Sequence, residues 1–104
     1  MGKMEKVFNE LKEKHSKIYW LDIPESDENG EKTIFLRKID RVTYSASQKL
    51  LEKDTLQATE MILRSLFVGG DSVEGVINDF DQLRAASELL VDVITVKKGN
   101  VRTS

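Results

Sequence analysis

Two short apolar runs separated by a polar segment constrain how this chain can fold. The first run, Ile18–Ile23, stops at the only proline, Pro24, and the second occupies Thr33–Leu36. The polar segment between them contains Asn29-Gly30, a pair that readily adopts the positive φ angles of a turn. The pattern predicts a β-hairpin over residues 18–36. Because two strands alone are marginally stable in water, at least one face of the hairpin has to pack on helices or on another chain.

The residues before the hairpin have the spacing of an amphipathic helix, with Lys and Glu between the apolar positions. This spacing predicts a helix over residues 1–17. Its apolar stripe contains Met4, Val7, Phe8, Leu11, His15 and Ile18.

The residues after the hairpin carry repeated start and stop signals for helices. Asp40 or Thr43 is expected to cap the first helix, and Asp54 begins a segment similar to a capping box. Gly69-Gly70 is expected to end the second helix through a left-handed C-cap.

A short helical turn weakened by Gly75 is predicted over Asp71–Ile77, and Asn78-Asp79 is expected to cap the last helix. Lys97-Lys98 suits a helix C-terminus and is followed by a glycine. The helical part is therefore predicted over residues 40–98, with a tail over residues 99–104. Together these elements predict a single α+β domain over residues 1–104, with an N-terminal helix, a β-hairpin and a C-terminal group of three to four helices.

The charge of the chain is nearly balanced, since 16 basic and 18 acidic residues give a net charge of −2. The two signs are interspersed, which disfavours nucleic-acid binding. No cysteine is present, so a disulfide framework and thiolate metal sites are excluded. No apolar run approaches the roughly 20 residues that cross a bilayer, and the N-terminus lacks the apolar core of a signal peptide. We expect a cytoplasmic protein that does not bind membranes.

The sequence contains no recognisable catalytic grouping. His15 is the only histidine, and the adjacent Ser16 diverges from it on a helix, so no triad can be assigned. The Asp27–Gly30 segment lacks the alternating ligands and the distal glutamate of a calcium loop, and a turn is the better interpretation. We expect no catalytic residue, no metal site and no cofactor, and a protein that is not an enzyme.

The predicted helices carry more apolar residues than one buried side needs. On the second long helix one side contains Leu56, Ile62, Leu63, Leu66 and Phe67. Met61 and Val68 fall nearly opposite, and Val91 lies off the stripe of the last helix. Either the hairpin and the first helix cover both sides, or these residues form a contact surface for self-association or for a protein partner. Met61, Val68 and Val91 are the candidate partner-binding residues.

The segment Phe35–Tyr44, with the sequence FLRKIDRVTY, resembles the opening of the small tail assembly chaperones of tailed phages and prophages. In that family a hairpin strand enters an Arg-Lys-Pro-x-Arg-like corner and then a helix. The resemblance extends over residues 18–98, with Ile39 and Thr55 at positions where the family often has proline. Later landmarks resemble related proteins from phages of gut bacteria: Asp54-Thr55-Leu56, Phe67–Asp71 and Asn78-Asp79-Phe80.

The resemblance implies a non-enzymatic protein that works in the host cytoplasm. Such chaperones bind the long tape-measure protein and keep it soluble until tail tube subunits polymerise around it. At the corner, Arg37 and Arg41 are expected to orient the hairpin and the helix through carboxylate pairs, with Asp40 as the third corner residue. Direct contact with the client is the alternative role of the two arginines. The alternative is a small structural component that stays in a virion or another complex and oligomerises through the same helices.

Overall fold

The computed structural model describes residues 2–94 of the chain, which form a mixed α+β fold. Within these residues five helices and three strands follow one another. They are α1 (Lys3–Lys14), β1 (Ile18–Ile23), β2 (Lys32–Arg37), α2 (Arg41–Leu51), α3 (Thr55–Leu66), β3 (Phe67–Gly70), α4 (Val73–Ile77) and α5 (Phe80–Ile94).

The three strands form one antiparallel sheet in the order β1-β2-β3. In the hairpin, the register runs from Ile18 opposite Arg37 to Ile23 opposite Lys32, without interruption. The predicted hairpin is therefore confirmed. On the other side of β2, β3 pairs with a register shift between Phe35 and Leu36.

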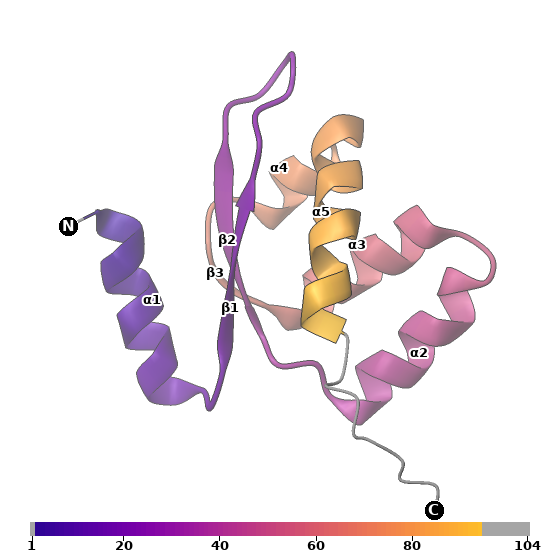
Figure 1. Cartoon of the computed structure of the whole chain (residues 1–104), viewed down its shortest axis with the longest axis horizontal. Coiled ribbons are helices and arrows are strands. Elements are labelled where there is room, and N and C mark those ends of the chain that lie inside the picture. The colour runs from indigo at the N-terminus through magenta and orange to yellow at the C-terminus, as the bar shows by residue number, and fades with distance from the viewer. Residues whose placement is uncertain (1, 95–104) are drawn as a thin grey trace, which may run out of the picture.

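Helices cover both faces of this sheet (Figure 1). α1 lies along one face, whereas α3, α4 and α5 lie on the other, and α2 packs mainly against α3. The expectation that at least one hairpin face packs on helices is thus met on both faces.

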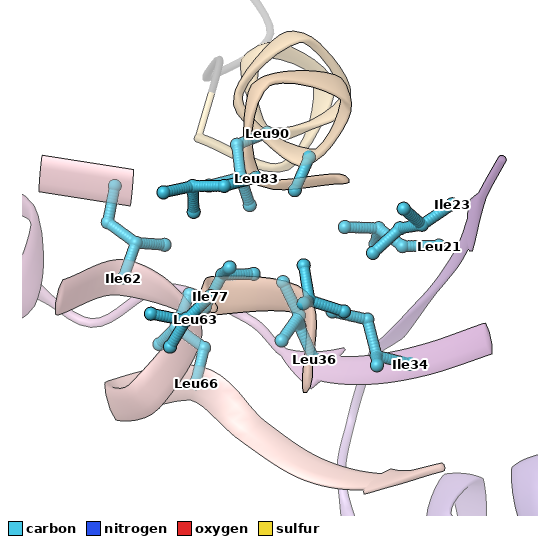
Figure 2. Packing of buried hydrophobic residues seen from close by; sticks show 12 residues of the cluster. Leu21, Ile23, Ile34, Leu36, Ile62, Leu63, Leu66, Ile77, Leu83 and Leu90 are labelled. Carbon is cyan, nitrogen blue, oxygen red and sulfur yellow. The ribbon is translucent and has the colours of Figure 1, made fainter. Parts of the chain in front are cut away.

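The larger part of the core lies between the sheet and α3, α4 and α5. Figure 2 shows aliphatic side chains from both layers pointing toward one another across this space. Their burial removes apolar surface from water, which is the main driving force for folding. The sheet contributes Leu21, Ile23, Ile34 and Leu36, and the helices contribute Ile62, Leu63, Leu66, Val76, Ile77, Leu83, Ala86 and Leu90.

An aromatic cluster fills the opposite side, between α1 and the sheet. The ring centroid of Phe8 lies 5.2 Å from that of Trp20 and 5.7 Å from that of Phe35. No residue of α1 is itself fully buried. At Gly69 an added Cβ would come within 3.0 Å of Leu11 Cδ1, so a glycine in β3 allows α1 to pack closely on the sheet.

Three of the predicted helix caps are confirmed. Asp40 accepts a hydrogen bond from the Thr43 N–H at 2.7 Å, so Asp40 is the cap of α2. Asp54 accepts from Leu56 and Gln57 at the start of α3, and Asp79 accepts from the Gln82 N–H in the first turn of α5. Each carboxylate satisfies N–H groups that have no partner within the helix.

The first helix is shorter than predicted. α1 ends at Lys14, and the backbone of His15 is already extended. Ile18 belongs to β1 rather than to the helix stripe, because its pairing with Arg37 begins the hairpin.

The predicted glycine C-cap at Gly69-Gly70 is wrong. α3 ends at Leu66, the next residue is extended, and Phe67–Gly70 pairs with β2 as a third strand. The segment is a strand because its backbone pairs with β2 instead of forming a left-handed cap on α3. The predicted helix end at residue 98 and the tail over residues 99–104 lie outside the described residues.

Gly70 is the residue whose conformation only glycine adopts easily. Its φ is +103°, and an added Cβ would lie 2.5 Å from the Thr33 carbonyl oxygen. We therefore expect Gly70→Ala to lower the free energy of unfolding by about 2 kcal/mol or more, measured by urea denaturation. Gly30→Ala is the control, because no atom lies within 4 Å of its added Cβ. Equal stability of the two variants would contradict the assigned strain.

Candidate protein-binding surface

α2 is covered mainly by one other element, the helix α3. It packs against α3 and stands away from the sheet (Figure 1). Ser47 is its only buried residue, and the Ser47 hydroxyl donates to the Tyr44 carbonyl oxygen at 2.8 Å. The side of α2 that faces α3 is thus only partly sealed from water.

Three apolar residues follow one another along α2 at intervals of four. They are Val42, Ala46 and Leu50, which we call the α2 stripe. Side chains at this spacing lie on the same side of a helix. Val42 is 80% exposed, Ala46 is exposed and Leu50 is half-buried. Tyr44, 39% exposed, adds a further accessible ring on the same helix.

The corner before α2 fixes the position of the helix. Arg37 Nη1 lies 3.0 Å from Asp40 Oδ2, and Arg37 Nη2 donates to the Ser65 carbonyl oxygen at 3.1 Å. One guanidinium thereby links the end of β2, the cap of α2 and the last turn of α3. A cation at that last turn also interacts favourably with the helix dipole. The expected carboxylate pair of Arg37 is present.

Asp40 is held in its charged form by its role as a cap. The Thr43 backbone N–H, the Thr43 hydroxyl and the Arg37 guanidinium all lower the pKa of Asp40, in that order of importance. The charged form is the better acceptor for the first turn of α2. Arg41 is exposed and has no ion pair with any side chain described in residues 2–91, so its expected carboxylate pair is absent there.

The candidate partner-binding residues come from three different elements, α3, β3 and α5. Met61 is half-buried and packs against the core on the helix side of the sheet. Val68 lies in β3, so the inference that Met61 and Val68 share one helix is wrong. Val91 is 57% exposed on α5. The partner-binding role of these residues stays a prediction.

Sequence reasoning missed the α2 stripe, although its spacing is visible in the sequence. The signal consists of the apolar residues Val42, Ala46 and Leu50 at intervals of four residues. Spacing alone does not show which side of a helix its neighbour covers. Only the packing of α2 on α3 shows that Val42 stays in water.

A hollow of about 320 Å³ lies between the hairpin loop and the start of α5. One of its acidic groups, Asp79, is engaged in the fold. Asp79 accepts from the Ser26 hydroxyl and, at 2.7 Å, from the Asn29 side-chain amide, while it also caps α5. These bonds attach the loop of the hairpin to the last helix.

Gln82 completes this attachment from inside the protein. Its side chain is 1% exposed, and its amide donates to the carbonyl oxygens of Pro24 and Gly30 at 3.2 and 2.8 Å. The side-chain oxygen of Gln82 accepts from Lys32 Nζ at 2.7 Å. The hydrogen-bonding capacity of this buried amide is thus largely satisfied, as a buried polar group requires.

Among the residues that the structure describes, no group of three or more His, Cys, Asp or Glu side chains is arranged to hold a metal ion. No described helix has both the length and the apolar character that crossing a membrane would require. The chain matched no protein-family model, no curated protein and no solved structure.

Alanine substitution of Arg37 and of Arg41 compares what each arginine of the corner contributes to the free energy of unfolding. Arg37→Ala should lower the free energy of unfolding by about 1 kcal/mol, because the Ser65 carbonyl and Asp40 lose a charged partner. Arg41→Ala should change it by less than about 0.5 kcal/mol, as is usual for an exposed side chain without such bonds. Urea denaturation of both variants checks this. A larger loss for Arg41→Ala would contradict the roles assigned to the pair.

Asp79 makes the stability depend on pH in the acid range. The Ser26 hydroxyl and then the Asn29 amide lower the pKa of Asp79 to about 2, against about 3.9 for an unfolded aspartate. Its carboxylate therefore stabilises the fold fully above about pH 4, and this contribution disappears as the pH falls toward about 2.

Asp79→Asn should therefore lower stability near neutral pH and reduce the loss of stability between about pH 4 and pH 2. Urea denaturation at several pH values measures both effects. Asp81→Asn is the control, because Asp81 is an exposed neighbour whose side chain makes no hydrogen bond in this network. An unchanged pH profile in Asp79→Asn would show that another group titrates.

Proposed function

We propose that this chain is a non-enzymatic assembly chaperone of the tailed-phage type, which binds a tape-measure-like client during tail assembly. The α2 stripe is the observation that carries the proposal. The chain keeps Val42 and Ala46 in water on a helix whose position is fixed by Arg37 and Asp40. The resemblance of residues 35–44 supports the same assignment, since this segment leads into α2.

An amphipathic client helix is the partner that fits the α2 stripe. A helix presents apolar residues at intervals of three and four, which match the spacing of Val42, Ala46 and Leu50. Packing would remove these side chains from water on both partners. The stripe is short, so each contact would be weak and reversible, which suits a chaperone that releases its client when tube subunits arrive.

A structural component of a virion is the alternative. The same exposed stripe could hold a permanent neighbour in a finished particle. The two functions differ in what is bound and in whether the chain stays in the particle. Both are proposals about protein–protein binding in the host cytoplasm or in the virion, and neither assigns a catalytic role.

The test is a capture experiment in cells that express the whole source genome, with the wild-type chain and with Val42→Glu as tagged baits. We expect the wild type to recover a long, helix-rich, tape-measure-like protein, identified by mass spectrometry. Val42→Glu should lose at least about ninety per cent of it, since a buried unpaired charge opposes docking. Purified phage particles should lack the chain.

Gln48→Glu is the matched control, because it adds the same charge to an exposed position of α2 outside the stripe. Circular dichroism should show the same helix content in all three proteins. Recovery of the client by Val42→Glu at the wild-type level would contradict binding through the α2 stripe. Finding the chain in purified particles, with tail or shell proteins as its partners, would favour the structural component.

A further inference from the structure

The two edges of the sheet are built differently. β3 has four residues, ends in two glycines and pairs with β2 through a register shift. Short strands and irregular pairing are devices that prevent an edge from accepting another strand. β1 has six residues in continuous register with β2, and no proline interrupts it. β1 is therefore longer and more regularly paired than β3, with Asp22 as its one charged residue and Pro24 directly after it.

The outer edge of β1 is also open. Figure 1 shows β1 nearest the viewer, between α1 and α5, with no described element in front of it. Within residues 2–94, no backbone hydrogen bond other than those of the hairpin ladder involves residues 18–23. Every second residue of an edge strand directs its N–H and C=O away from the ladder. These groups are available to a further strand.

The charges at the two ends of β1 indicate which strand would fit. Lys17 precedes the strand and Glu25 follows it after Pro24, and both side chains are exposed. In an antiparallel pair the start of one strand meets the end of the other. A second copy of β1 would therefore bring Lys17 opposite Glu25 at both ends of the pair, if Leu21 lies on the two-fold axis.

The same register suits the side chains between the two ends. With Leu21 opposite its own copy, Trp20 stands opposite Asp22 of the second copy. Trp20 is 36% exposed, and its Nε1 already donates to Asp22 Oδ1 within the chain at 2.8 Å. An indole and a carboxylate are compatible neighbours, and no like charges meet directly, which would oppose pairing.

We propose that the chain forms a two-fold dimer by antiparallel pairing of β1 with β1 of a second copy. The two sheets join into one sheet of six strands. Residues opposite each other on paired antiparallel strands point to the same face, so both copies of α1 lie on one face and both copies of α5 on the other. This dimer uses an edge of the sheet, not the α2 stripe.

The charge pairs allow a test with two variants that dimerise weakly alone but should form a dimer with each other. Lys17→Glu places two acids together at each end of the dimer, and Glu25→Lys places two lysines together. Each variant should raise the dissociation constant of the dimer by roughly tenfold or more. Sedimentation velocity over a series of concentrations measures this constant for each protein and for a mixture of the two.

In the mixture, each end of the strand pair would again join one acidic and one basic side chain. The reason is that the Lys17→Glu variant has an acid at positions 17 and 25, whereas the Glu25→Lys variant has a lysine at both of these positions. The mixture should therefore form heterodimers with about the wild-type affinity, and added salt should weaken them. Glu52→Lys is the control, because it makes the same change on an exposed residue after α2 and should leave the dimer intact.

Three results of the sedimentation measurements would overturn the proposal. They are a wild-type chain that stays monomeric at every concentration, a dimer that neither substitution weakens, and a mixture that stays monomeric. Far-UV circular dichroism of each variant confirms that its fold is retained. Binding of an extended client peptide to β1 by a monomeric chain would equally overturn self-pairing. This test does not depend on the proposed function, since loss of the dimer and loss of the client are measured separately.

Discussion

The fold depends on the central strand, β2, being covered on both faces and paired on both edges. Ile34, Phe35 and Leu36 are three consecutive residues with no exposed surface. Ile34 and Leu36 belong to the core under the helices, whereas the Phe35 ring contacts Phe8 and Trp20 on the other side. Because strand side chains alternate between faces, such a run is stable only with a cover on each face. α1 and the α3–α5 group supply these two covers, and β1 and β3 supply the two edges.

Local signals in the sequence are sufficient for much of this arrangement. The hairpin follows from its turn residues and its two apolar runs, and Asp40, Asp54 and Asp79 each satisfy N–H groups within three residues of themselves. Such interactions involve neighbours in the chain, so their residue types are informative by themselves. The Arg37–Asp40 pair belongs to the same class, since it spans three residues at the corner.

The third strand and the exposed stripe could not be predicted because distant residues determine them. Phe67 and Val68 continue the apolar pattern of α3, and two glycines after a helix normally indicate its C-cap. Only pairing with Leu36 and Phe35 makes this segment a strand. Similarly, Val42 and Leu51 are both apolar residues of α2, and only the position of α3 decides which remains in water. Local preference gives way to tertiary contacts at both places.

The two proposed contact regions lie on different parts of the fold. β1 lies in the sheet between α1 and α5, whereas α2 packs on α3 away from the sheet. A dimer through β1 would therefore leave both copies of the α2 stripe accessible. A long client with several amphipathic helices could then contact two stripes at once, and the second contact would form at the high effective concentration set by the first. Two weak contacts of this kind hold a client more firmly than one, and each still opens readily by itself. Dimerisation would thus let a short stripe retain a long client while tube subunits displace it one contact at a time.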